Sequence, residues 1–371
     1  MKVILVYVET FKYRITLADK KELCGLVSAW GAIIAEEFFC KMVEFDPGYL
    51  IKLGKRLQLC SLVTTHQPAG VIFSCNLTPI QEKNLSQILA CPVIDYTRLI
   101  LDIFALRAHS FAGKLQVTLA KLEHEGTRLV KGWTHLERQR GGVGLRSGPG
   151  ETQLESDRRR LRQKVTVLKG RLNKLRKQRI QNRIARKKNN LFTVALVGYT
   201  NAGKSSLFNR LVSEKVPATS MVFTTLDPLV RKLYLADFGV LLLVDTVGFI
   251  RNLPHQLVDA FHATLEETRE ADLLLHVVDV SDEEKSIKIN VVNQVLADIG
   301  ASEIPQLMVM NKVDLLSGAV LQDTPDFDQK SSAIWTSVTA NYGISNLLKS
   351  ISAVLSEIKN KKNYFHRSCQ K

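Results

Sequence analysis

The chain has 371 residues, and its 51 Lys or Arg against 36 Asp or Glu give a formal net charge of +15 at pH 7. That length allows two or three domains with proper cores, and an apolar share of 45% is typical of a soluble globular protein. No apolar run approaches the roughly 20 residues of a membrane-spanning helix, which excludes an integral membrane protein. The first residues are typical of a strand and not of a signal peptide, and the six cysteines lack zinc or disulfide spacing, so we expect a cytoplasmic protein.

Residues 1–108 are predicted to form a small α/β domain. Apolar runs at 3–8, 70–74 and 92–94 indicate strands, and the segments between them are predicted to contain helices. This domain shows no strong catalytic signature.

The positive charge is concentrated in one segment. Residues 137–190 contain 18 Lys or Arg against four Asp or Glu, so this segment carries +14 of the whole charge of +15. Apolar residues recur in it at alternating four- and three-residue steps, as in a helix packed on another helix. They are Leu161, Val165, Leu168, Leu172 and Leu175. A similar series lies upstream, with Gly126 at one position: Leu115, Leu119, Leu122 and Leu129.

These two series predict an antiparallel helical hairpin over residues 109–190, with a Gly-rich tip at 141–150. A second helix from residue 151 to about residue 189 would span roughly 50 to 60 Å. Such a basic arm with a small end suits a narrow, phosphate-lined space in structured RNA. Transient association with an acidic membrane is the alternative, but the apolar positions are already needed between the helices. The expected RNA contacts are Arg138, Arg140, Gly142, Gly144, Arg146, Arg158, Arg159 and Arg160.

Residues 191–360 are predicted to form a doubly wound nucleotide-binding domain. An apolar run at 191–197 precedes a sequence that fits the phosphate-loop pattern G-x-x-x-x-G-K-[ST]. The backbone N–H groups of such a loop, with the positive end of the following helix, bind phosphates. Lys204 is expected to reach the terminal phosphates, and Ser205 to hold Mg²⁺. The loop comprises Gly198, Tyr199, Thr200, Asn201, Ala202, Gly203, Lys204 and Ser205, and Ser206 follows it.

Two further motifs are expected to surround the phosphates. Asp245 ends an apolar run at 241–244, so its carboxylate is placed to contact Mg²⁺ through water. The backbone N–H of Gly248 is expected to approach the γ-phosphate. In the switch loop upstream, Thr225 is expected to close over Mg²⁺ and the γ-phosphate. The other residues expected to contact GTP in these motifs are Phe223, Thr224, Thr246 and Val247.

The base is predicted to be guanine. Asp314 can accept hydrogen bonds from both the ring N–H and the exocyclic amine of guanine, a pair that adenine lacks. Asn311 is expected to bridge the base and the phosphate loop, and the stem of Lys312 to cover the ring face. A backbone N–H at Val338 is expected to reach the guanine carbonyl. That last motif consists of Ser337, Val338 and Thr339.

One absence bears on the mechanism. Phe249 follows Gly248, where Ras-like GTPases carry a glutamine that orients the attacking water. Slow hydrolysis is therefore expected of the chain alone, with the missing group supplied by another loop, an ion or a partner. Asn201 can help to bind K⁺ near the bridging phosphate oxygen, or it can simply suit the turn. The candidate catalytic residues are Lys204, Thr225, Gly248 and Asn201.

Several motifs together resemble the HflX family of ribosome-associated GTPases. They are R-L-I-L-D-I-F-A at 98–105, W-T-H-L-E-R at 133–138, G-P-G-E-T-Q-L-E at 148–155, and D-T-V-G-F-I at 245–250 with L-P-H at 253–255. The resemblance covers nearly the whole chain. It implies binding to the large ribosomal subunit and its RNA, with the tip near the peptidyl transferase centre. It also implies splitting or rescue of stalled ribosomes under stress, and GTP hydrolysis that this subunit stimulates.

Two other functions stay open. The chain could be an RNA-modification or ribosome-assembly factor that uses GTP as a switch, or a non-enzymatic ribosome silencer for which GTP is a structural ligand. Deletion of 141–150 separates the ribosome-splitting function from the RNA-modification or ribosome-assembly function. Lys204→Ala tests the function of a non-enzymatic silencer. We expect a monomer that binds GTP and GDP, with residues 361–371 as a short C-terminal tail.

Overall fold

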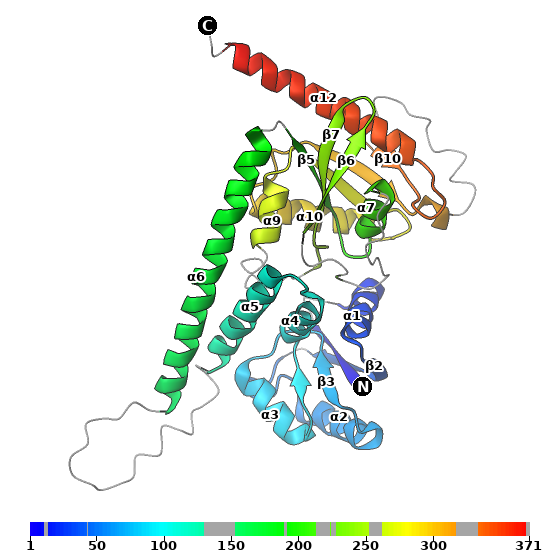
Figure 1. Ribbon diagram of the computed structural model, residues 1–371. Helices are drawn as coiled ribbons and strands as arrows, with labels where there is room; N and C mark the ends of the chain where they lie inside the picture. The colour runs from blue at the N-terminus through cyan, green and yellow to red at the C-terminus, as the bar shows by residue number, and fades with distance from the viewer. Residues whose placement is uncertain are drawn as a thin grey trace, which may run out of the picture. The chain divides into compact units, whose positions relative to one another are not determined.

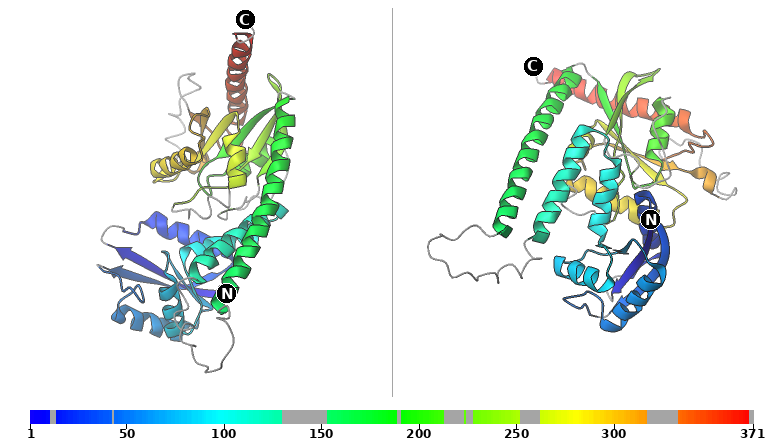
Figure 2. Two further views of the ribbon diagram at one scale, coloured as in Figure 1. Left: turned by 90° about the vertical axis from the view of Figure 1, so that its left-hand side faces the viewer. Right: turned by 60° about the horizontal axis from the view of Figure 1, so that its bottom comes forward.

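The computed structural model describes residues 1–10, 14–42, 44–129, 153–188, 191–212, 223, 228–251, 262–316 and 333–368. They form two compact units, Met1–Leu175 and Arg176–Lys371, each of mixed helices and strands (Figures 1 and 2). The α/β class predicted from the sequence is confirmed.

The first unit is built on a parallel sheet with the strand order β2-β1-β3-β4. The strands are β1 (Lys2–Thr10), β2 (Ile33–Met42), β3 (Gly70–Phe73) and β4 (Val93–Ile94). Helices α1 (Leu17–Trp30), α2 (Leu53–His66), α3 (Pro79–Leu89) and α4 (Tyr96–Arg107) alternate with them. Capping boxes at Thr16 and Thr78 start α1 and α3, because each threonine accepts from a backbone N–H that would otherwise lack a partner.

Strand β2 was missed in the sequence. It pairs with β1 from Lys2↔Ile33 to Thr10↔Met42, with an irregularity after Val3. As an edge strand it buries Phe38, Cys40 and Met42 and exposes much of the rest, including two adjacent glutamates. The period-two pattern is therefore weak, and the strand could not be separated from the helices around it.

The basic segment forms a helical pair in which α5 (Phe111–Leu129) precedes α6 (Gln153–Lys188). The predicted seam residues of α6 from Leu161 to Leu175 are partly buried, and most of their neighbours are exposed. A Cβ on Gly126 would lie 3.2 Å from Leu161 Cδ2, and Lys169 Nζ lies 2.8 Å from Glu123 Oε1. The residue numbers of the two contacts fall along α5 and rise along α6, so the helices are antiparallel, as predicted. Tip residues 141–150 lie outside the described residues.

The second unit has a sheet with the order β10-β9-β8-β5-β7-β6, parallel except for the pair β6 and β7. The strands are β5 (Phe192–Val197), β6 (Leu229–Leu235), β7 (Gly239–Asp245), β8 (Leu273–Asp279), β9 (Gln306–Asn311) and β10 (Ala333–Trp335). The helices are α7 (Lys204–Val212), α9 (His262–Arg269), α10 (Lys285–Asp298), α12 (Ile344–Ser368) and the 3₁₀ turn η2 (Val313–Leu315). Because β5, β7, β8 and β9 are parallel, their carboxyl ends share one edge of the sheet.

Helices α7 and α12 contribute to one apolar core with the sheet, through side chains such as Phe208 and Ile351. Helix α12 continues to Ser368, so it extends past residue 360, where the domain was predicted to end, into the predicted tail at 361–371. No Gly or Pro occurs between Ile344 and Ser368, so nothing in the sequence breaks the helix.

Candidate nucleotide site

The phosphate loop lies between β5 and α7. Gly203 has φ +93°, and a Cβ there would come within 2.3 Å of Asn311 Nδ2, so only glycine fits. Lys204 begins α7 and turns back into the loop, where its Nζ donates to the carbonyls of Gly198 (3.0 Å) and Tyr199 (2.7 Å). The Lys204 side chain is buried, and burial lowers its pKa to about 8, although Asp245 opposes the shift. The loop therefore holds a buried amine ready to pair with phosphate.

Ser205 and Asp245 meet beside this amine. The Ser205 hydroxyl donates to Asp245 Oδ2 at 2.7 Å, and the Asp245 side chain is fully buried at the end of β7. A hydroxyl and a carboxylate are the hard oxygen ligands that Mg²⁺ prefers, so these residues fit the metal on which phosphate-loop GTPases generally depend. When bound, Mg²⁺ would neutralise charge developing on the phosphates. Ser205 and Asp245 would hold it, directly and through water respectively.

The segment after Asp245 is joined to the phosphate loop through its backbone. Phe249 N donates to Gly198 O at 3.2 Å, and Thr200 N donates to Phe249 O at 2.8 Å. A Cβ on Gly248 would lie 2.8 Å from Thr200 Cγ2 and 3.0 Å from Lys204 Nζ, so glycine is required by space. The backbone of Gly248 therefore lies against the phosphate loop, as the predicted γ-phosphate contact needs. The Phe249 side chain is buried.

The base-recognition residues gather at the ends of β9 and β10. Asn311 Nδ2 donates to Ala202 O at 3.0 Å, so the predicted bridge to the phosphate loop is present. Thr336 Oγ1 donates to Asn311 Oδ1 at 3.4 Å from the other side. Lys312 has φ +66° and pairs through Nζ with Asp279 Oδ2 at 2.6 Å. These three contacts fix the connection between β9 and η2 against the phosphate loop, Thr336 and Asp279.

Asp314 is exposed in η2 and is oriented by two hydroxyls. Ser337 Oγ donates to Asp314 Oδ1 at 2.5 Å, and Thr339 Oγ1 donates to Oδ2 at 2.9 Å. The bond from Ser337 is the main cause of a lowered pKa at Asp314, so the carboxylate is ionised at neutral pH. Val338 is half-buried beside them, and the role of its backbone N–H stays a prediction. An ionised, oriented carboxylate suits the two donors of guanine.

Further predicted residues belong to the switch loop, the phosphate loop, α6 and the region around the Gly-rich tip. Thr224 and Thr225 lie outside the described residues, as do Arg138, Arg140, Gly142, Gly144 and Arg146, while Phe223 is buried. Arg159 and Arg160 are exposed on α6, and Arg158 is partly exposed. Asn201 is exposed with φ +61°, a conformation that asparagine tolerates in turns. Both readings of Asn201 therefore stay open.

Sequence reasoning missed one side chain near the loop, His276, and one contact of a loop residue, Tyr199. Tyr199 Oη accepts a hydrogen bond from Arg251 N at 2.9 Å, which ties the phosphate loop to the segment after Gly248. His276 is buried in β8, and its pKa is lowered to about 4, first by burial and then by Lys204, so it is neutral at pH 7. His276 belongs to no recognised motif, and the phosphate-loop pattern does not specify what the side chain of Tyr199 contacts. The one available signal was a polar residue, His276, inside an apolar run.

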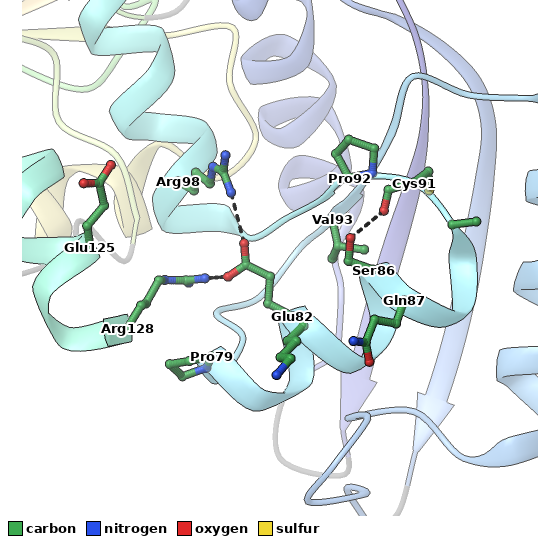
Figure 3. A pocket seen from close by; sticks show the side chains of 12 residues that line it. Pro79, Glu82, Ser86, Gln87, Cys91, Pro92, Val93, Arg98, Glu125 and Arg128 are labelled. Carbon is green, nitrogen blue, oxygen red and sulfur yellow. Dashed lines mark hydrogen bonds and ion pairs between the residues drawn. The ribbon is translucent and has the colours of Figure 1, made fainter. Parts of the chain in front are cut away.

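A separate cavity of about 950 Å³ lies in the first unit between α3, α4 and α5 (Figure 3). Glu82 pairs there with Arg98 at 3.0 Å and with Arg128, and Arg128 also pairs with Asp95 at 2.5 Å. The arginines are thus engaged by carboxylates, and none of the described residues that line this cavity is a glycine. It does not have the construction of a phosphate loop, so the nucleotide site is assigned to the second unit.

The fold and this constellation define a phosphate-loop GTPase. Three family models match the chain: the GTP-binding GTPase N-terminal region at 18–105, the GTP-binding GTPase middle region at 107–186, and 50S ribosome-binding GTPase at 193–312. The chain belongs to the HflX family of GTPases. The resemblance seen in its motifs is thereby confirmed, and so is its assignment as a GTP-hydrolysing enzyme.

Individual relatives align over most of the chain. It is 48% identical over 340 residues to GTPase HflX of Escherichia coli (strain K12), covering 92% of this chain and 80% of that protein. It is 44% identical over 336 residues to GTPase HflX of Caldanaerobacter subterraneus subsp. tengcongensis, covering 91% and 76%. The crystal structure of SsGBP with GDP is similar with a TM-score of 0.54 and 25% identity, covering 96% of this chain and 99% of that one. None of the described helices has both the length and the apolar character needed to cross a membrane.

The lowered pKa of Lys204 leads to a prediction about nucleotide binding. Phosphate stabilises the ammonium form, so binding should raise the Lys204 pKa from about 8 toward its ordinary value of 10.5. At pH 8 GDP binding should therefore take up about half a proton, and less at lower pH where the amine is already charged. Titration calorimetry in buffers of different ionisation enthalpy measures the number of protons taken up when GDP binds. Absence of uptake at pH 8, or the same uptake in Lys204→Ala, would contradict the assignment.

Proposed function

We propose that the GTP-bound protein engages the large ribosomal subunit and splits or rescues stalled ribosomes, and that the subunit stimulates the hydrolysis that resets it. The observation that carries this proposal is the junction of a basic arm and a GTPase. Helix α6 contains 15 Lys or Arg and two Asp or Glu, and only three residues separate it from β5, the strand that leads into the phosphate loop. The match of 193–312 to the 50S ribosome-binding GTPase model supports the same partner.

The geometry supports a division of labour in hydrolysis. The phosphate-loop amides and Lys204 bind the β- and γ-phosphates, and Gly248 approaches the γ-phosphate through its N–H. The buried Phe249 leaves the attacking water without a side-chain partner at that position. Chemistry by the chain alone is then slow, and a group ordered or contributed on the ribosomal subunit completes the site.

The same proposal covers the remaining expectations. Mg²⁺ would bind at Ser205, Thr225 and, through water, Asp245, and Asn201 is the candidate for a K⁺ contact. The arm would bind ribosomal RNA through Arg158, Arg159 and Arg160 and through the tip at 141–150. We propose a cytoplasmic monomer, with domains at 1–108, 109–190 and 191–360; transient membrane association through the basic arm is the weaker option.

Stimulation by the large subunit is the test of this function. GTP hydrolysis is measured for the protein alone, with large subunits and with small subunits, at low salt in potassium and again in sodium. We expect stimulation of about 100-fold or more by large subunits only, within the range that a supplied catalytic group gives.

The control is a variant in which 141–150 is replaced by a short Gly-Ser linker. It should retain intrinsic hydrolysis and lose ribosome splitting. Equal rates with all three additions would refute the proposed partner and favour a different RNA. Equal rates in potassium and sodium would remove the proposed K⁺ role of Asn201 and leave the rest standing.

A further inference from the structure

An ion pair joins the basic arm to the helix that follows the γ-phosphate motif. Arg176 Nε on α6 lies 2.7 Å from Glu266 Oε1 on α9, and both residues belong to the second unit. The Glu266 side chain is 6% exposed, whereas that of Arg176 is 52% exposed. Figure 1 shows α9 lying beside this part of α6. A carboxylate so deeply buried needs a charged partner, because burial without one is strongly unfavourable.

Helix α9 is the element through which the nucleotide state would reach this ion pair. It is the first described helix after Gly248, and it begins at His262. In phosphate-loop GTPases the segment after this glycine is ordered by γ-phosphate contacts and released on hydrolysis. Gly248 already lies against Thr200 and Lys204, so a phosphate bound there would contact the start of this segment. The buried end of the ion pair therefore lies on the first described helix downstream of the γ-phosphate motif.

Helix α6 is the element through which a change of nucleotide state would reach the rest of the basic arm. It is one unbroken helix from Gln153, directly after the Gly-rich segment, to Lys188. Its described side chains are mostly exposed, and residues 176–188 contain seven Lys or Arg and no acidic residue. The ion pair of Arg176 with Glu266 links this stretch to α9. This pair and the short connection to β5 thus both join α6 to elements of the second unit.

We propose that Arg176 and Glu266 are positioning residues that couple α9 to α6, so that the nucleotide state sets the state of the arm and RNA bound to the arm acts back on hydrolysis. For its biological meaning this inference rests on the proposed function, but the coupling itself requires no ribosome. Coupling between two sites is reciprocal, so one contact accounts for both directions. Arg176 lies outside the nucleotide-binding motifs, and it acts only through Glu266.

The first test is amide hydrogen exchange of the full-length protein with GDP and with a non-hydrolysable GTP analogue. In the unmodified protein we expect exchange in 262–269 and in 176–188 to slow by about fivefold or more with the analogue, the lower end of typical coupling. In Arg176→Ala the response of 262–269 should remain and that of 176–188 should disappear. Arg171→Ala is the matched control, because it removes the same charge from an exposed position on the same helix.

Charge reversal separates a specific pair from general damage. Arg176→Glu should lose the response of α6, and combining it with Glu266→Arg should restore it. A response of 176–188 that survives Arg176→Ala would overturn the proposal. So would an unmodified protein in which α6 does not respond to the nucleotide, or a double variant that folds but shows no recovery.

The second test uses large ribosomal subunits. Arg176→Ala should lower subunit-stimulated hydrolysis by about tenfold relative to Arg171→Ala, with intrinsic hydrolysis and GTP affinity unchanged. Equal stimulated rates in the two variants would overturn the proposal that RNA bound to the arm acts back on hydrolysis through this ion pair. If the subunit fails to stimulate even the unmodified protein, the proposed function falls, and the exchange measurement still decides the role of the ion pair.

Discussion

Replacing Lys204 with Ala is expected to lower the GTP hydrolysis rate by about 100- to 1000-fold, the range measured when a preorganised donor to developing charge is removed. This amine donates to the Gly198 and Tyr199 carbonyls, so it is aimed into the concave phosphate loop. The variant also loses charge-assisted hydrogen bonds to the ground-state phosphates, so affinity for GDP and GTP should fall as well. Single-turnover hydrolysis and equilibrium binding separate the two effects.

Lys232→Ala is the matched control for this variant. Lys232 is exposed on β6, so removing it changes the net charge equally without touching the loop. The Lys204→Ala protein should still fold, because it loses a buried ammonium whose desolvation is unfavourable. A cooperative unfolding transition would verify this. Retention of more than about a tenth of the original rate would show that another group performs the role assigned to Lys204.

The second large effect is expected at the base. Asp314→Asn should lower GDP affinity by about 100-fold or more, because two hydrogen bonds from guanine to an ionised carboxylate are lost. The amide oxygen of the variant can still accept from the ring N–H, but its amide nitrogen would face the exocyclic amine of guanine as donor against donor. Xanthine offers a carbonyl in place of the exocyclic amine, so affinity for xanthosine diphosphate should rise in the same variant. Competition binding with the three diphosphates of guanosine, xanthosine and adenosine measures the exchange of preference.

The surroundings of Asp314 sharpen this experiment. Ser337 and Thr339 hold the two carboxylate oxygens, and a hydroxyl can reverse its donor direction to accept from the new amide. The variant should therefore keep the local arrangement and change only the pattern of hydrogen-bond donors and acceptors that faces the base. Asp298→Asn, an exposed change at the end of α10, serves as control. Unchanged GDP affinity in Asp314→Asn would place guanine recognition elsewhere.

Much of the nucleotide site could be anticipated because motif residues follow buried strands. Asp245 and Asn311 each end a strand of the central sheet, and parallel strands deliver such residues to one edge without knowledge of the packing. The helical pair could be predicted for a similar reason, since a repeated apolar spacing identifies the buried side of a helix. In both cases the information is local.

Contacts between distant positions could not be predicted in this way. Glu266 and Arg176 are 90 residues apart, and a charge on a helix does not reveal which opposite charge it will meet. The hydrogen bond from Arg251 N to Tyr199 Oη likewise depends on how two loops pack. Strand β2 was missed because an edge position relaxes the pattern by which strands are recognised.

The two carbonyls that accept from Lys204 also bear on how the protein reloads. Gly198 O and Tyr199 O already satisfy the buried ammonium, so a phosphate that pairs with Lys204 replaces one set of oxygen acceptors by another. The net free energy gained from this pairing is therefore smaller than it would be for an ammonium without acceptors. Each round of nucleotide binding is thus an exchange of hydrogen-bond partners at Lys204.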